Sequence, residues 1–285
     1  MDLFFDLLRS VIYGVIEGIT EWLPISSTGH MILAEQVLKF SFSAEFMEMF
    51  RVVIQLGAIL AVVVMYFKKL WPFCVDNGRD SGLAKHIRWP VMRLWFKIIV
   101  ACLPAAVLGL ALDDWIDAHF YNSVVVAVML IVYGIAFILI ERRPRVPTTT
   151  KLSRITYRQA LIVGAWQVLA LIPGTSRSGS TIIGGMLCGC SRTAAAEFTF
   201  FLAIPVMFGW GVLKLIKYLM AVGLAMTATE IAVLVVGIVT AFVVSVISIK
   251  FLMGYIKKND FTAFGVYRII VGLVVLAYFG VKVLL

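Results

Sequence analysis

Charged residues are scarce in this sequence. Aspartate, glutamate, lysine and arginine together make up 14% of its 285 residues, whereas hydrophobic residues make up 62%. A soluble domain typically carries about 25% charged and about 45–50% apolar residues. This excess of apolar surface is more than a globular core can bury. The composition therefore argues against an ordinary soluble domain and favours a protein embedded in a lipid bilayer.

Cysteine is also rare, and the four copies are Cys74, Cys102, Cys188 and Cys190. Their spacing matches neither a zinc site nor a disulfide framework. The sequence therefore gives no sign of a structural metal centre or of a fold held together by disulfides.

The sequence contains long apolar runs that hold few charged residues. A bilayer-spanning helix needs about 17–25 mostly apolar residues. Six runs reach this length, near 50–67, 94–112, 123–140, 198–219, 229–253 and 264–284. Four shorter runs flank clusters of proline, glycine and serine, near 3–16, 31–38, 157–172 and 181–190. The sequence thus predicts an all-α polytopic membrane protein with six transmembrane helices and two pairs of re-entrant helices.

The net charge of +9 arises mainly from three loops. The loops at one predicted face hold fourteen lysines and arginines, and the segments at the opposite face hold two. The basic loops are 68–93, 141–158 and 254–262, and the opposite segments are 1–49, 113–122 and 220–228. Cytoplasmic loops are typically enriched in basic residues. This asymmetry predicts both termini outside the cytoplasm and argues against nucleic acid as a partner.

The two halves of the chain, residues 1–145 and 151–285, resemble each other. At a shift of about 150, Gly14, Glu17, Ser26 and Gly29 align with Gly164, Gln167, Ser176 and Gly179. Each half then reads as one re-entrant pair with three spans. A second copy of a unit with three spans must insert upside down, so we expect an inverted-topology repeat. The interrupted segments should meet within the membrane and form a polar site.

The first interrupted segment, 14–30, carries two carboxylates. Glu17 and Glu21 lie four residues apart and so share one face of a helix. A carboxylate inside a membrane is costly unless it is paired, protonated or bound to a cation. The alternative, a solvated end of an N-terminal helix, is disfavoured by the apolar flanks.

A turn rich in hydroxyl groups follows these carboxylates. Pro24 ends the first helix, and Ser26, Ser27 and Thr28 are suited to cap the next one. His30 comes in its first turn. The hydroxyls alone would indicate only a helix cap, and a lone histidine is more often a satisfied core residue. Their joint occurrence with two carboxylates indicates a functional site.

The second interrupted segment, 167–181, places one arginine among hydroxyl groups. The neighbours of Arg177 are Thr175, Ser176, Ser178, Ser180 and Thr181. Helix N-termini bind phosphates through free N–H groups, and arginine adds a two-pronged, permanently charged donor. The alternative role of Arg177 is to pair with Glu17 or Glu21. The two roles overlap, because an arginine can hold a carboxylate until substrate arrives.

These groups together suit phosphoryl transfer. Glu17 and Glu21 can hold a divalent cation such as Mg²⁺, which prefers oxygen ligands. The cation and Arg177 would offset charge on the phosphoryl oxygens. Either a hydroxyl or an imidazole can serve as the nucleophile when a neighbouring base activates it.

Two motifs, EGITEWLPISSTGH and PGTSRSGST, closely resemble the signatures of the bacterial undecaprenyl-diphosphate phosphatase family, also called the bacitracin-resistance family. The likeness extends to VVIQLGAILAVVV (52–64) and FLAIPVMFG (201–209). The resemblance implies a phosphatase that converts undecaprenyl diphosphate, a polyprenyl diphosphate lipid, to undecaprenyl phosphate. This reaction recycles the lipid carrier for cell-wall synthesis and confers bacitracin resistance. The resemblance also implies a divalent cation (Mg²⁺ or Ca²⁺), a periplasm-facing site in the inner membrane, contact with membrane lipids and a homodimer.

The resemblance also implies a role for each site residue. Glu17 and Glu21 would be the metal or acid–base carboxylates. Ser27 and His30 would be the nucleophile and its partner, in either order. Arg177 would clamp the diphosphate. The expected supporting and substrate-binding residues are Ser26, Thr28, Ser176, Ser178 and Thr181.

Two other functions fit part of the pattern. A transporter or flippase for the lipid carrier would share the inverted repeat, but translocation needs no intramembrane nucleophile. A type-2 phosphatidic acid phosphatase would need a further histidine after its Ser-Arg motif. No histidine follows Arg177 in this sequence, so we reject that possibility. Lipid-diphosphate phosphatase is the main prediction, and the transporter is the alternative.

Overall fold

The computed structural model describes residues 2–38, 40, 42–78, 82–143, 146–223 and 226–284. The described elements are α1 (Asp2–Thr20), α2 (Ser27–Val37), α3 (Ala44–Met65), α4 (Phe67–Leu70), η1 (Gly82–His86), α5 (Trp89–Phe120), α6 (Ser123–Glu141), η2 (Leu152–Arg154), α7 (Tyr157–Val168), η3 (Leu169–Leu171), α8 (Arg177–Leu187), α9 (Arg192–Val222), α10 (Ala228–Tyr255) and α11 (Thr262–Leu284). The predicted all-α class is confirmed.

Six helices of the described part are long and apolar enough to span a membrane. They lie at Ala44–Met65, Trp89–Leu112, Ser123–Glu141, Arg192–Ala221, Ala228–Tyr255 and Thr262–Phe279. Each coincides with one predicted span, so the polytopic membrane class is confirmed. The first of these helices, α3, begins six residues before its predicted start at 50. Its first turns carry polar residues, including Glu45 and Glu48, and are capped by Ser43.

The four shorter apolar runs form α1, α2, α7 and α8. The first is longer than its apolar run suggested, because α1 continues past residue 16 to Thr20. In the second half, α7 ends at Val168 and a short 3-10 turn, Leu169–Leu171, follows it. The chain then turns through Pro173 and Gly174 into α8.

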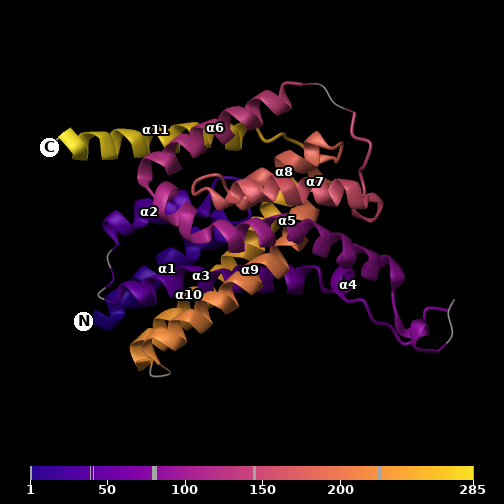
Figure 1. The fold of residues 1–285 in the computed structure, drawn as a ribbon, viewed down its shortest axis with the longest axis horizontal. Helices are drawn as coiled ribbons and strands as arrows, with labels where there is room; N and C mark the ends of the chain where they lie inside the picture. Colours follow the sequence, from indigo (N-terminus) through magenta and orange to yellow (C-terminus); the bar gives the residue numbers. More distant parts are fainter. Residues whose placement is uncertain are drawn as a thin grey trace.

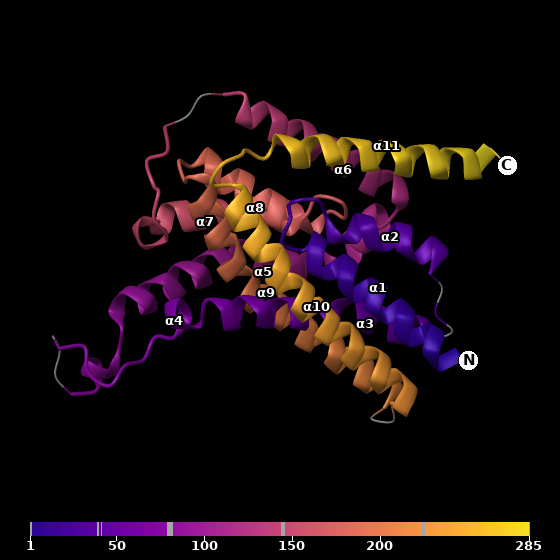
Figure 2. The same ribbon diagram turned by 180° about the vertical axis from the view of Figure 1, so that it is seen from behind.

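The two halves of the chain are interlocked. Helix α1 packs along α10, and α7 packs along α5 (Figure 1; Figure 2 shows α1 beside α10). Each of these shorter helices, which lead into the turns of the interrupted segments, therefore packs along a long helix of the other half. The aligned glycines make both close approaches possible. A Cβ at Gly14 would lie 2.8 Å from Gly237 O, and one at Gly164 would lie 2.3 Å from Ala101 O. Small residues permit this close packing of helices.

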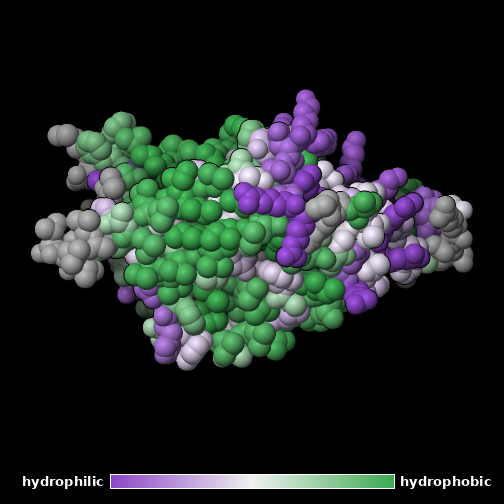
Figure 3. Space-filling model, turned by 90° about the horizontal axis from the view of Figure 1, so that it is seen from above, coloured by the Kyte–Doolittle hydropathy of each residue, from purple (hydrophilic) through white to green (hydrophobic). Residues whose placement is uncertain are grey.

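The surface separates an apolar body from a polar end. Both chain ends lie at one end of the molecule, and the segment that follows α4 lies at the other (Figure 1). Figure 3 shows hydrophobic side chains over the centre and hydrophilic ones mainly towards the end with that segment. Large apolar side chains on the spans remain exposed, including Leu139 at 53% and Ile247 at 63%. Such a surface suits lipid rather than water.

Candidate active site

The turns that interrupt segments 14–30 and 167–181 share one backbone conformation. Ser26 and Ser176 have φ angles of 74° and 71°, the only positive values at non-glycine positions in the described chain. Each serine caps an 11-residue helix. Its hydroxyl accepts a hydrogen bond from the amide of Gly29 (3.4 Å) or Gly179 (3.1 Å). A positive φ at a non-glycine residue costs about 1–3 kcal/mol and is typical of functional sites. The predicted capping role of Ser26 is confirmed.

A buried arginine from α11 joins the two turns. The Arg268 guanidinium donates to Pro24 O of the first turn at 3.0 Å, and to Gly174 O and Thr175 O of the second, each at 2.9 Å. The residue is 0% exposed. Sequence reasoning did not identify it. The available signal was an arginine inside an apolar span, which marks a site of structural or functional importance.

Next to this junction, Arg177 and Glu21 form a buried ion pair. Arg177 Nη2 and Nε donate to Glu21 Oε1 at 2.8 and 3.2 Å. The two side chains are only 11% and 8% exposed. The Ser27 hydroxyl donates to the other oxygen, Oε2, at 3.0 Å. The structure therefore brings together three predicted site residues from the two halves, and it gives Arg177 the pairing role that the sequence left open.

Glu17 and its aligned residue Gln167 are buried, and each has side-chain atoms that lack a hydrogen-bond partner in the described chain. They are 1% and 2% exposed. Within the described chain, one Glu17 oxygen (Oε1) and both polar atoms of the Gln167 amide lack a hydrogen bond, as does the Thr175 hydroxyl. A buried, unsatisfied polar group is destabilising by about 1–3 kcal/mol. Oxygen and amide groups in this state are suited to a cation, water or phosphate.

His30 lies in the first turn of α2 but does not pair with Ser27 among the hydrogen bonds of the described residues. Its Nδ1 contacts Ser26 O at 2.8 Å, and its Nε2 contacts the Tyr267 hydroxyl at 2.7 Å. The hydroxyl of Ser27 is directed to Glu21 instead. Tyr267, like its neighbour Arg268, was not singled out from the sequence.

Three of the remaining predicted residues, Ser176, Ser178 and Thr181, lie at the start of α8. The Thr181 hydroxyl donates to Arg177 O at 2.9 Å and accepts from Thr199 Oγ1 at 2.9 Å. The hydroxyl groups of Ser176 and Ser178 are 3.2 Å apart. These contacts fix the start of the helix that carries Arg177. Thr28 is partly exposed at the start of α2, and its role in substrate binding remains a prediction.

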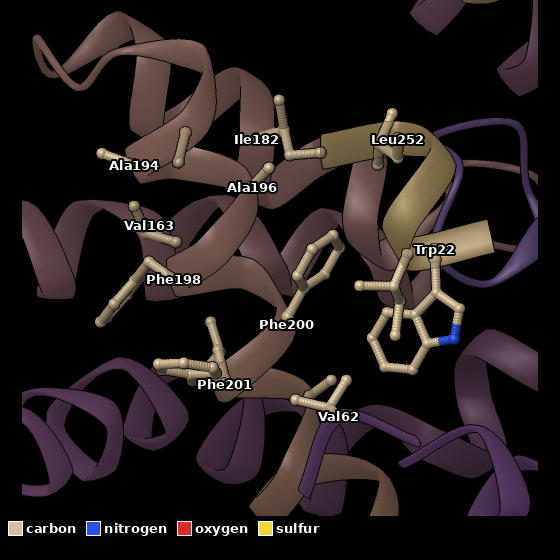
Figure 4. Packing of buried hydrophobic residues seen from close by; sticks show 14 of the residues in the cluster. Trp22, Val62, Val163, Ile182, Ala194, Ala196, Phe198, Phe200, Phe201 and Leu252 are labelled. Carbon is tan, nitrogen blue, oxygen red and sulfur yellow. The ribbon is translucent and has the colours of Figure 1, made fainter. Parts of the chain in front are cut away.

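An apolar wall backs the ion pair. Trp22 packs edge-on against Phe200, with ring centroids 5.3 Å apart, in a cluster that includes Leu252 (Figure 4). The Arg177 guanidinium lies 6.0 Å from the centre of the Trp22 ring. Trp22 and Phe200 are fully buried. In such apolar surroundings the charges of Glu21 and Arg177 interact more strongly than they would in solvent.

Known proteins closely match this sequence. Residues 10–274 match the model of a family described as bacitracin resistance protein BacA. The chain is 58% identical to an undecaprenyl-diphosphatase of Enterococcus faecalis, over 97% of this chain and 98% of the relative. It is 57% identical to one of Desulfitobacterium hafniense, over 98% of both. It is 54% identical to one of Acetivibrio thermocellus, over 96% of this chain and 98% of the relative.

Proposed function

This chain belongs to the BacA family of bacitracin resistance proteins, and on that premise we propose that it is an undecaprenyl-diphosphate phosphatase. It hydrolyses undecaprenyl diphosphate to undecaprenyl phosphate and inorganic phosphate. This recycles the lipid carrier for cell-wall synthesis and confers resistance to bacitracin. The observation in the structure that best supports the activity is the buried cluster of Glu21, Ser27 and Arg177, drawn from both halves of the chain.

The chain forms an inverted repeat of residues 1–145 and 151–285, with re-entrant pairs α1–α2 and α7–α8. Support comes from the matching backbone at Ser26 and Ser176, and from the reciprocal packing of α1 on α10 and α7 on α5. The active site opens to the periplasmic side of the inner membrane, with both termini on that side. The basic loops and the common end of the two termini support this orientation. The proposal of a homodimer rests on the family resemblance alone.

Arg177 changes partners when substrate binds. In the resting protein its guanidinium is neutralised by Glu21. A phosphate group, like a carboxylate, can accept two parallel hydrogen bonds from the planar guanidinium, and a diphosphate carries more negative charge than a carboxylate. The substrate therefore draws Arg177 towards the phosphoryl oxygens and releases Glu21 for proton transfer or cation binding.

The residues of the site fit a divalent cation. Within the described chain no three histidine, cysteine, aspartate or glutamate residues come together as a metal cluster. Mg²⁺, however, is usually held by one or two carboxylates, with waters and substrate phosphates completing its shell. Glu17, with its unpartnered buried oxygen, and Glu21 meet this requirement. The cation would neutralise charge on the diphosphate as the phosphoryl group departs.

Ser27 is the nucleophile in the proposed reaction. Its hydroxyl already donates to Glu21, which is the arrangement of a nucleophile with its general base. Ser27 Oγ attacks the terminal phosphorus while its proton passes to Glu21. The bond from that phosphorus to the bridging oxygen breaks, and undecaprenyl phosphate leaves. Water then cleaves the phosphoserine, giving inorganic phosphate and restoring the serine proton.

Activity should depend on a divalent cation held through Glu17. Purified protein in detergent is expected to release phosphate from undecaprenyl diphosphate, to stop with EDTA and to recover with Mg²⁺. Glu17→Gln should lower the rate by about 10–100-fold at a fixed metal concentration, as expected when metal binding weakens. Rates measured across a metal titration would detect this, with exposed Glu45→Gln as the control. Activity that EDTA does not affect would refute the requirement for a metal. Absence of phosphate release by folded wild-type protein would refute the phosphatase function.

The phosphorylated intermediate should identify the nucleophile. If Ser27 attacks, rapid acid quenching with labelled substrate should trap a phosphoenzyme that survives acid, as phosphoserine does. Ser27→Ala should abolish it, whereas Ser153→Ala, which changes an exposed serine in η2, should not. An acid-labile, alkali-stable phosphoenzyme would show that His30 is the nucleophile instead.

A further inference from the structure

The hydroxyl group of Tyr267 on α11 is hydrogen-bonded to His30 on α2. The tyrosine hydroxyl lies 2.7 Å from His30 Nε2. The two rings are parallel to within 2°, with centroids 5.6 Å apart. Residues 30 and 267 lie in different halves of the chain, so this contact depends on the folded arrangement of the halves.

The other nitrogen of His30 determines the tautomer. Nδ1 lies 2.8 Å from Ser26 O, and a carbonyl oxygen can only accept a hydrogen bond. Nδ1 must therefore carry a proton. In the neutral ring the lone pair then lies on Nε2. The Tyr267 hydroxyl donates to that lone pair, so both ring nitrogens have a defined partner.

We propose that Tyr267 is a positioning residue of the active site, which holds His30 in one orientation and in the tautomer whose lone pair lies on Nε2. The proposal rests on the phosphatase function proposed above. In that reaction Glu21 takes the proton of Ser27, and His30 Nε2 accepts a proton from the water that cleaves the phosphoserine. Tyr267 acts through His30 rather than on the substrate.

A hydroxyl suits this task because it both donates and accepts. While Nε2 is unprotonated, the Tyr267 hydroxyl donates to it. Once Nε2 has gained a proton, the same oxygen accepts from the new N–H after its own hydrogen turns away. The contact can thus hold the ring in both protonation states, and tyrosine stays neutral throughout.

The position of Tyr267 is fixed by its neighbour. Arg268 anchors α11 to both interrupted turns through Pro24, Gly174 and Thr175. This anchoring fixes the rotation and height of α11 beside α2. The Tyr267 side chain is 42% exposed, so burial of its ring contributes less than it would in a core. The hydrogen bond to His30 is the specific contact that the ring makes in the described structure.

The experiment is a double-mutant cycle on phosphate release. Tyr267→Phe removes only the hydroxyl and should lower kcat about tenfold, the effect of one ordinary hydrogen bond, with KM nearly unchanged. In a His30→Gln background, followed at high enzyme concentration, the same change should have an effect of less than about twofold, because residues that act together are not additive. Tyr278→Phe, another partly exposed tyrosine of α11, is the matched control and should leave kcat unchanged.

A spectroscopic measurement isolates the tautomer. The chain has only three histidines, so ¹⁵N labelling gives few signals, and His86→Gln and His119→Gln variants assign them. In wild type, His30 should show a protonated Nδ1 and a hydrogen-bonded, unprotonated Nε2. In Tyr267→Phe the Nε2 signal should shift towards that of a nitrogen without a donor.

The two proposals fail in different ways. Equal losses for Tyr267→Phe in both backgrounds, or no loss in the wild-type background, would overturn the positioning role while the phosphatase remains. A protonated Nε2 in neutral His30 would also overturn it. Absence of phosphate release by folded wild type would refute the function itself, whatever the ¹⁵N spectra show.

Discussion

Replacing Arg177 with alanine is expected to lower kcat/KM by at least about 10³-fold, because arginines that stabilise transferring phosphoryl groups contribute about 10³–10⁵-fold. The change removes the two-pronged donor that the diphosphate requires. It also leaves Glu21 buried without its cation. Removing one partner of a buried ion pair costs about 3–5 kcal/mol.

Lysine in place of Arg177 separates the effect of positive charge from the effect of the two-pronged guanidinium. Arg177→Lys keeps the positive charge but cannot donate in parallel to two oxygens. It also cannot readily reach Thr199 O, to which Arg177 Nη1 donates at 3.0 Å. We expect an intermediate loss of about 10²-fold, since a bidentate site does not accept lysine as an equivalent. Initial rates over a range of undecaprenyl diphosphate concentrations measure both variants.

The control for Arg177 is an ion pair away from the site. Arg192 pairs with the buried Glu141, with Nη2 and Oε2 2.5 Å apart. Arg192→Ala should therefore reduce the amount of folded protein, measured by size-exclusion chromatography, but not the activity of each folded molecule. If Arg177→Ala kept activity within about tenfold of wild type, one hydrogen bond would suffice to explain its role, and the clamp would be refuted.

The six spans and the two capped turns were predictable because their signals are local. Spans depend on the length of an apolar run, and a cap depends on a hydroxyl before a helix. The partnership of Arg177 with Glu21 was also open to sequence reasoning. Two opposite charges in apolar surroundings must find each other or another partner.

Other parts of the site depend on helix packing. Tyr267 and Arg268 lie in an apolar run whose composition indicates only a span, and their roles follow from where α11 lies beside α2 and α6. The pairing of Ser27 was also beyond the sequence. Its spacing from His30 suggests that they are neighbours on α2, but the capping geometry directs the Ser27 hydroxyl to Glu21 and His30 Nδ1 to Ser26 O.

Replacing Arg268 should cost both stability and activity. Inside a membrane no bulk water satisfies the carbonyl groups of an irregular turn, so protein donors must do so. Arg268 serves Pro24 O, Gly174 O and Thr175 O at 2.9–3.0 Å. Hydrogen bonds to a charged donor are worth about 1.5–3 kcal/mol each. Arg268→Met removes all three, and should lower the thermal unfolding temperature in detergent and the yield of folded protein.

Arg268→Lys distinguishes the effect of the planar guanidinium, with its several donors, from the effect of positive charge alone. An ammonium group is compact and cannot span both turns as a guanidinium does, so one turn should lose its donor. A displacement of about 1 Å in catalytic groups can cost about 10²-fold in rate, and we expect a kcat loss of that size in the folded fraction. Lys250→Met, which removes an exposed cation from α10, is the control. Wild-type stability and kcat in Arg268→Lys would mean that positive charge alone holds the two turns together.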